Sequence, residues 1–293
     1  MGRGAGNLKT ELILTVLEPK GRADINYNAL SEIVAAFAEL QQKYNWGTNL
    51  PYMVSGANSL PQKDVMDWVS KNRYSLSAIV NALQNQKDKI ADNLKMPVFK
   101  KQGNHINKAI IIGGGKSSLD NVLAIKEMVE KRTGYCLIHS SSRNAKPFAN
   151  INVPQFYCLV GNEGYRLASI FNDLSSLEHI YVLPPYPRKM GTYIPDQIID
   201  KTFELESINF IDKFNDSPLT LAIQLALDLV IDELYFVGFD GYNSSINQVQ
   251  YEVALENQEI FDNLAKVNFS KIAFLTPTKY KGLRKESIFG YLR

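Results

Sequence analysis

The sequence has few of the residues that build disulfide frameworks or catalytic histidine clusters. Its 293 residues include two cysteines and three histidines. Both cysteines, Cys136 and Cys158, lie in apolar segments with the pattern of strands. This placement predicts buried free thiols in a reducing compartment and argues against a disulfide.

An excess of charge of one sign and long apolar runs are missing as well. The formal net charge is +2, so electrostatics give no reason to expect nucleic acid as the main partner. No apolar run is long enough to cross a membrane, and the N-terminus lacks the apolar core of a signal peptide. With 45% hydrophobic and 21% charged residues, the chain is expected to be globular and cytoplasmic.

Residues 1–92 predict an all-helical section, because their apolar positions repeat at helical spacing. Ser31 is expected to cap the clearest of these helices. The expected helices begin at Thr10 and cover Ser31–Tyr44, Leu50–Ser55, Gln62–Lys71 and Ser75–Gln86. We expect the helices of residues 50–86 to expose apolar faces, which would favour a homo-oligomer. The apolar residues in question are Met53, Val65, Trp68, Val69, Ile79 and Leu83.

Residues 93–107 are polar, with Pro97, Gly103 and several lysines, and predict a linker. In residues 108–293 short apolar runs alternate with helical patterns. This alternation predicts a doubly wound, mainly parallel, Rossmann-like α/β sheet covered on both faces. The expected strands are Lys108–Ile112, Tyr135–His139, Gln155–Val160, His179–Leu183, Glu233–Val237 and Ile272–Leu275.

A glycine turn between the first of these strands and a helix is the first candidate site. Such a turn offers backbone N–H groups and the positive end of a helix dipole to an anion. Ile110 occupies the first glycine position of a Walker A loop, and Ser118 the third of a dinucleotide fingerprint, so neither motif fits. The turn predicts a generic nucleotide or phosphate site, with a tight turn without ligand as the alternative. Its residues are Gly113, Gly114, Gly115, Lys116, Ser117 and Ser118.

Asp240 is the second candidate, because it follows the strand Glu233–Val237 at the carboxyl end, where open α/β sheets bind ligands. His139 and His179 are candidates for a general base by residue type only, and structural roles are the commoner use of such histidines. Arg188 and Lys189 could meet phosphate, although a solvated loop is the simpler interpretation.

The N-terminal residues resemble a known family. The run Gly2-Arg3-Gly4-Ala5-Gly6-Asn7, followed by Glu11, resembles the last active-site loop of the DRE-type metal-dependent aldolases and lyases. Residues 46–56 and 72–75 look like the helical region that follows the barrel in that family. The resemblance implies a helical remnant of a TIM-barrel aldolase that acts on a 2-oxo acid with Mn²⁺ or Mg²⁺. Asn7 would be the remnant of its metal site.

The family's other metal ligands, an Asp and a pair of histidines, have no counterpart in this section. A complete barrel also needs about 250 residues. We therefore expect a fragment without aldolase activity of its own, with no cofactor assigned to it. The pairing of domains suggests a parent protein in surface-polysaccharide precursor synthesis.

The glycine turn and the element Ser217–Tyr242 resemble a second group, a Rossmann-like set that contains bacterial surface-glycan sialyltransferases and flagellin-modification proteins. That group's Gly-Pro-Ser-Leu is replaced here by Gly115-Lys116-Ser117-Ser118-Leu119. This resemblance implies an alternative function for residues 108–293, namely nucleotide or nucleotide-sugar binding or transfer. A non-catalytic scaffold is the third alternative.

Overall fold

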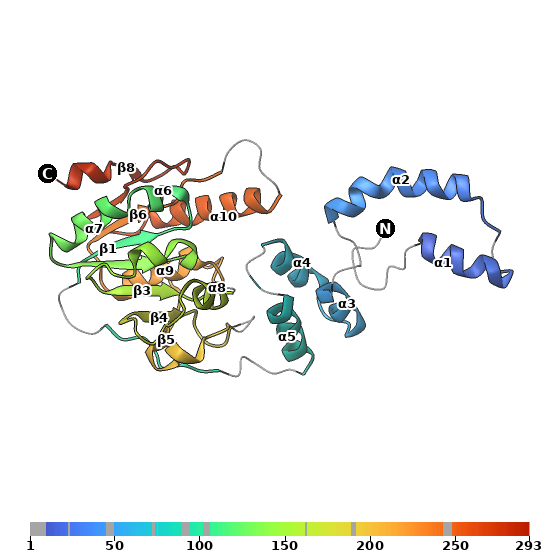
Figure 1. The fold of residues 1–293 in the computed structure, drawn as a ribbon, viewed down its shortest axis with the longest axis horizontal. Helices are drawn as coiled ribbons and strands as arrows, with labels where there is room; N and C mark the ends of the chain where they lie inside the picture. The colour runs from blue at the N-terminus through green and yellow to red at the C-terminus, as the bar shows by residue number, and fades with distance from the viewer. Residues whose placement is uncertain are drawn as a thin grey trace. The chain divides into compact units, whose positions relative to one another are not determined.

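The computed structural model describes residues 10–22, 24–44, 50–71, 74, 76–88, 94–101, 106–161, 163–188, 192–242 and 248–292. The chain divides into two compact units, residues 1–90 and residues 91–293. We call them the helical unit and the α/β unit (Figure 1).

Within its described residues the helical unit contains helices and no strand. Helices alone do not identify a remnant of a TIM-barrel aldolase, so that origin stays a prediction. None of the helices in the described residues of either unit is long and apolar enough to cross a membrane. The helices of this unit are α1 (Thr10–Leu17), η1 (Glu18–Lys20), α2 (Tyr27–Tyr44), α3 (Leu50–Ala57), α4 (Gln62–Ser70) and α5 (Leu76–Lys87).

Helix α2 begins one turn earlier than the sequence predicts. The side chain of Asn26 accepts hydrogen bonds from the backbone N–H groups of Asn28 and Ala29, at 3.1 Å each. Asn26 thus satisfies the amides that the first turn leaves without partners. The predicted cap at Ser31 is wrong, because Ser31 lies within the helix and donates its hydroxyl to the Asn28 carbonyl at 3.0 Å.

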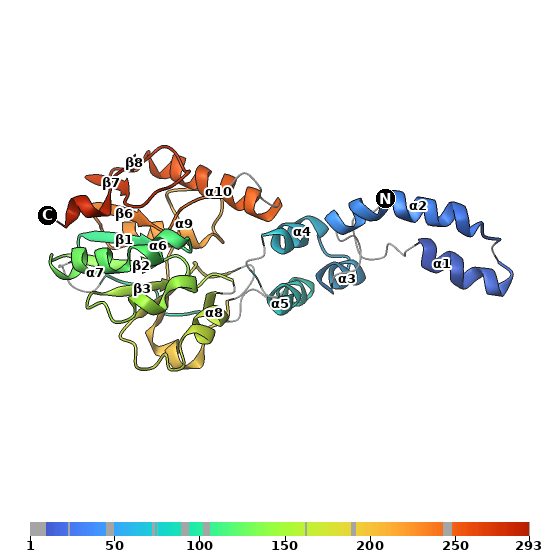
Figure 2. The same ribbon diagram turned by 45° about the horizontal axis from the view of Figure 1, so that its top comes forward.

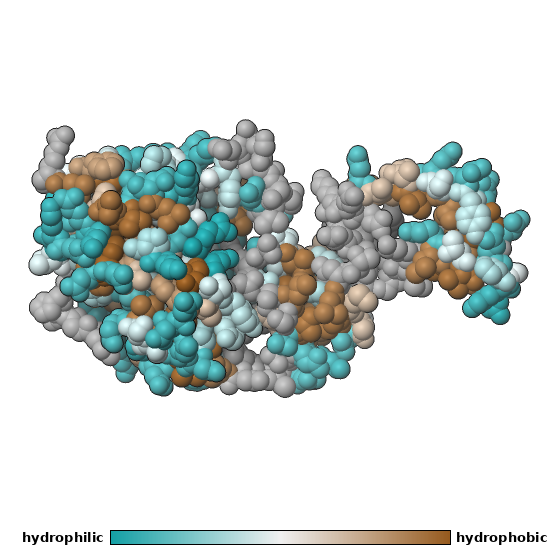
Figure 3. Space-filling model, viewed as in Figure 1, coloured by the Kyte–Doolittle hydropathy of each residue, from teal (hydrophilic) through white to brown (hydrophobic). Residues whose placement is uncertain are grey.

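The apolar residues predicted to be exposed on residues 50–86 are mostly buried. Val65, Trp68, Ile79 and Leu83 are all buried, and only Met53 is largely exposed. Helices α3, α4 and α5 contact one another and cover these side chains. The argument for association through this surface therefore fails. The large apolar residues that stay exposed in this unit lie mainly on α1 and α2, and include Leu12, Val16, Ile33, Phe37 and Leu40. Figure 3 shows apolar surface over these two helices and also over α3–α5.

The α/β unit contains an eight-stranded sheet in the order β5-β4-β3-β2-β1-β6-β7-β8, with every neighbouring pair parallel. The predicted parallel α/β fold is confirmed. The short strands β5 and β8 were not predicted. The strands are β1 (Lys108–Ile112), β2 (Tyr135–His139), β3 (Gln155–Cys158), β4 (Ile180–Leu183), β5 (Thr202–Glu204), β6 (Glu233–Val237), β7 (Lys271–Phe274) and β8 (Arg284–Lys285).

Helices cover both faces of the sheet (Figure 2). Ile111 of β1 packs in one core with residues of α9 and α10, whereas its neighbours Ile110 and Ile112 pack in another core with residues of α7. This alternation follows from the two-residue repeat of a strand. Cys136 and Cys158 are buried free thiols, as predicted. The helices are α6 (Lys116–Asp120), α7 (Val122–Glu130), α8 (Glu163–Ile170), α9 (Pro218–Asp228) and α10 (Gln248–Leu264), with η2 (Ser142–Asn144), η3 (Lys146–Phe148), η4 (Asp196–Lys201) and η5 (Ile288–Tyr291).

Part of the predicted linker packs along the sheet edge. Phe99 donates its N–H to the Glu204 carbonyl at 2.8 Å, and the Glu204 N–H donates to the Pro97 carbonyl at 3.0 Å. Both interpretations of Arg188, as a phosphate ligand or as part of a solvated loop, are wrong. Its guanidinium is buried and forms an ion pair with Glu204 at 3.0 Å. Lys189 lies outside the described residues.

Candidate functional site

The strand order creates a crevice between β1 and β6. From β1 the chain passes outward through β2, β3, β4 and β5, and then returns to form β6 on the other side of β1. The connections that leave the carboxyl ends of β1 and β6 therefore run in opposite directions. In open α/β sheets ligands bind at such a switch point. The glycine turn follows β1 here, and Asp240 follows β6.

The two loops approach each other at backbone distance. Gly113 donates its N–H to the Val237 carbonyl, and Gly115 donates to the Gly238 carbonyl, both at 2.8 Å. A Cβ atom added to Gly113 or Gly115 would lie 2.5 or 2.6 Å from the oxygen of Gly238. These two glycines are therefore required by the close packing of the loops, whether or not a ligand binds.

Asp240 binds the start of α6 directly. Its carboxylate accepts hydrogen bonds from the Ser117 N–H at 3.1 Å and from the Ser117 hydroxyl. The Ser117 hydroxyl also lies 2.9 Å from the hydroxyl of Thr276, which follows β7. The structure thus brings together Ser117 and Asp240, two of the predicted site residues. However, the carboxylate takes up the Ser117 amide, which is then not free to bind an external anion.

Two amides of the turn remain open. Among the described residues, no partner exists for the backbone N–H groups of Gly114 and Lys116. The Lys116 side chain is exposed, whereas Ser118 is buried and donates its hydroxyl to the Gly115 carbonyl at 2.8 Å. Gly114 lies beside Arg143, since a Cβ at this glycine would be 3.8 Å from the Arg143 Cδ. The side of the turn that faces β2 can therefore receive an anion.

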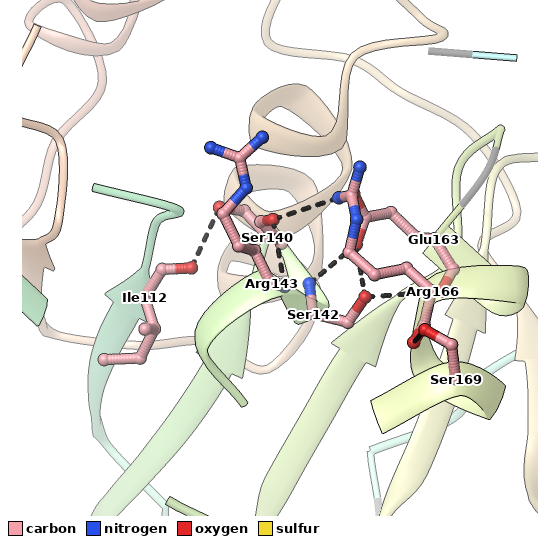
Figure 4. A network of polar contacts seen from close by, with 8 residues as sticks. Ile112, Ser140, Ser142, Arg143, Glu163, Arg166 and Ser169 are labelled. Carbon is pink, nitrogen blue, oxygen red and sulfur yellow. Dashed lines mark hydrogen bonds and ion pairs between the residues drawn. The ribbon is translucent and has the colours of Figure 1, made fainter. Parts of the chain in front are cut away.

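A polar network after β2 and β3 extends the site, and sequence reasoning missed it (Figure 4). Buried Glu163 of α8 accepts hydrogen bonds from the N–H and the hydroxyl of Ser142, at 2.6 Å each. Glu163 also pairs with Arg166, whose guanidinium lies 3.4 Å from the Ser141 hydroxyl. The run of serines followed by Arg143, directly after a strand, was the signal available in the sequence.

Asn144 joins this network to the glycine turn. Its side-chain amide donates to the Gly115 carbonyl and to the Ser118 hydroxyl, at 2.9 Å each. Arg143 stays exposed and, in the described part of the chain, has no carboxylate partner. The carboxyl edge thus carries two cations, Lys116 and Arg143, beside two open amides, with Arg166 close by.

The histidines of the sheet belong to the core. His139 is buried, and its Nε2 lies 2.9 Å from the side-chain oxygen of Gln155. Its ring stacks on Tyr157, with 4.3 Å between the ring centroids. Burial lowers the pKa of His139 to about 4 and that of His179 to about 4. These observations favour structural roles for both. His105 lies outside the described residues.

The low pKa of His139 predicts a loss of stability in mild acid. The folded-state pKa of about 4 is below the unfolded value of 6.5, so the unfolded chain binds the proton first as the pH falls. This contribution is complete above pH 6.5 and declines toward pH 4. For His139 alone we expect the free energy of unfolding to fall by about 2 kcal/mol between pH 7 and pH 5.

Urea unfolding at pH 7, 6 and 5 measures this decline. The variant His139→Phe keeps the ring contacts and should have a shallower pH dependence than the unaltered protein. Parallel pH profiles for the two proteins would show that His139 does not titrate as expected.

The predicted metal site lies largely outside the described residues. Asn7 and the glycine loop that resembles the aldolase loop are not described, and Glu11 lies on α1. Across the ranges that the structure describes, no group of three or more His, Cys, Asp or Glu side chains could hold a metal ion. The described residues thus do not form a site for the Mn²⁺ or Mg²⁺ of an aldolase.

Comparisons with known proteins identify no relative. No protein-family profile, no curated protein and no solved structure matches the chain. The resemblances to metal-dependent aldolases and to sialyltransferase-like proteins therefore stay predictions from the quoted residues.

Proposed function

We propose that the α/β unit binds the phosphate of a nucleotide or nucleotide-sugar at the switch point of its sheet. The observation that carries the proposal is the pair of open amides, Gly114 and Lys116, of which Gly114 lies next to the side chain of Arg143. Backbone N–H groups at such a turn bind phosphate oxygens, and arginine adds charge-assisted hydrogen bonds to them.

The charges also indicate on which side of the turn the phosphate lies. Asp240 holds a negative charge on the β6 side, where it bonds to Ser117. A phosphate on that side would be repelled by the carboxylate. On the β2 side it meets Arg143 and the Gly114 amide, and there we place it.

An aldolase origin is a separate proposal. It rests on the likeness of Gly2–Asn7 and Glu11 to the metal-dependent aldolase loop, and no contact in the described residues adds to it. Assays for pyruvate release from 2-oxo acids with Mn²⁺ test it. We expect this chain by itself to give no release.

Calorimetric titration with CMP, UDP and GDP at low ionic strength tests the phosphate site. We expect Arg143→Ala and Lys116→Ala each to weaken nucleotide binding about tenfold, because each removes a charged partner of the phosphate. Arg284→Ala is the matched control, since Arg284 is an exposed arginine of the edge strand β8. This variant should bind nucleotides as tightly as the unaltered protein does.

Two results would contradict the proposal. One is the absence of binding by any nucleotide in the millimolar range. The other is an Arg143→Ala variant that binds as tightly as the Arg284→Ala control.

A further inference from the structure

Two tyrosines form a stacked pair on the surface of the α/β unit. Tyr165 of α8 and Tyr193, which follows β4 along the chain, have ring centroids 3.8 Å apart and planes within 8°. Yet 46% of Tyr165 and 41% of Tyr193 remain exposed. Packing in the core does not account for this pair, because the tyrosines of the core, such as Tyr181, are fully buried.

The backbone holds the two tyrosines in place. Gly164 passes directly against the Tyr193 carbonyl, and a Cβ atom at Gly164 would overlap that oxygen. The start of α8 and the segment around Tyr193 are thereby fixed to each other. Since both rings are ordered before any ligand arrives, a ligand that stacks on them would lose little binding energy to side-chain ordering.

Helix α8 connects the tyrosine pair with the proposed phosphate site, because it carries both Tyr165 and Arg166. Tyr165 is followed by Arg166, whose guanidinium lies 3.4 Å from the Ser141 hydroxyl. That hydroxyl is also 3.3 Å from a Cβ built on Gly114. Figure 4 shows Arg143 and Arg166 extending to the same side, beyond the ends of the strands. Helix α8 thus carries, in consecutive residues, one tyrosine of the pair and a cation that reaches the Ser141 hydroxyl beside the turn.

We infer that the Tyr165–Tyr193 pair is a stacking platform for the base of a nucleotide. This inference rests on the proposed phosphate site and narrows the class of its ligand to nucleoside phosphates. Inorganic phosphate and sugar phosphates have no base to stack and would bind more weakly. Every nucleobase has a flat π surface that stacks on an aromatic side chain. The platform places the base on the β3 and β4 side of the switch point, away from Asp240.

Calorimetric titration of the full chain with AMP, CMP, ribose 5-phosphate and inorganic phosphate tests the platform. We expect the nucleotides to bind about 5- to 150-fold more tightly than ribose 5-phosphate, which corresponds to about 1–3 kcal/mol for stacking of one base. Tyr165→Leu should remove most of this difference and leave ribose 5-phosphate binding unchanged. Tyr165→Phe should keep it, because the ring is retained.

The matched control is Tyr251→Ala, which removes a half-exposed tyrosine of α10. It should change none of the affinities. Thermal unfolding of Tyr165→Leu and Tyr165→Phe shows whether either substitution disturbs the fold. The ratio of the affinities of one variant for a nucleotide and for ribose 5-phosphate does not depend on how much of that variant is folded.

The outcomes separate the two proposals. If nucleotides and ribose 5-phosphate bind equally well, or if Tyr165→Leu weakens both to the same extent, the platform is overturned and the phosphate site stands. If no phosphate-bearing ligand binds, the proposed function fails and the platform with it.

Discussion

Glu204→Gln is expected to lower the free energy of unfolding by about 3–5 kcal/mol. The Glu204 side chain is 3% exposed and accepts hydrogen bonds from Arg188 and from the Met96 N–H, at 3.0 Å each. Arg188, whose side chain is 5% exposed, also donates to the Pro184 carbonyl at 3.1 Å and to the Leu94 carbonyl. Loss of the carboxylate charge removes the buried counter-charge that Glu204 supplies to this guanidinium. The cost is large because water cannot solvate that charge in the folded state.

Urea unfolding at pH 7 measures the effect of Glu204→Gln. The control is Glu127→Gln, since Glu127 forms an ion pair with Lys131 whose side chains are 42% and 71% exposed. Exposed pairs of this kind contribute less than about 1 kcal/mol. If the two variants lose equal stability, the Arg188–Glu204 pair does not hold the segment before β1 against the sheet edge. The double variant Arg188→Met with Glu204→Leu should recover much of the loss, because it removes both buried charges.

Gly113→Ala is expected to destabilise the α/β unit by about 3 kcal/mol and to weaken nucleotide binding. The new Cβ would lie 2.5 Å from the Gly238 oxygen and 3.0 Å from the Gly238 carbonyl carbon. Both atoms belong to the backbone, so no side-chain rotation relieves the contact. The loops after β1 and β6 must move apart, which strains the hydrogen bonds from Gly113 to Val237 and from Gly115 to Gly238.

Gly290→Ala provides the control for this substitution. Gly290 lies in η5, and no atom lies within 4 Å of a Cβ built there. We expect its unfolding midpoint to change little. An unfolding midpoint for Gly113→Ala equal to that of Gly290→Ala would mean that the two loops are not packed at backbone distance.

The main strands could be predicted because each is a short run of apolar residues followed by a turn. β1, β2 and β6 begin and end where the sequence predicts. β5 and β8 could not be found in this way. β5 has three residues and mixes Thr202 and Glu204 with one phenylalanine, and β8 consists of Arg284 and Lys285. Such segments become strands because a neighbouring strand supplies hydrogen-bond partners, which no local pattern records.

The candidate site was found in part. Ser117 and Asp240 were named from their positions after strands, and they lie in contact. The sequence could not show that the carboxylate would bind the Ser117 amide and so leave only Gly114 and Lys116 open. Nor could it show that Glu163 and Arg166, from a helix that the apolar pattern did not reveal, would lie beside Ser141 and Ser142.

Local chemistry alone determined the parallel α/β character of residues 108–293, the glycine turn after β1 and the burial of both cysteines. These properties depend on the spacing of apolar residues and on backbone conformations within a few residues. Only the tertiary structure decided which of the exposed cations lie beside the open amides of the turn. It also decided that Asp240 would contact Ser117, which is 123 residues away in the sequence. The order of strands sets those contacts, and that order results from the packing of the whole sheet and its helices.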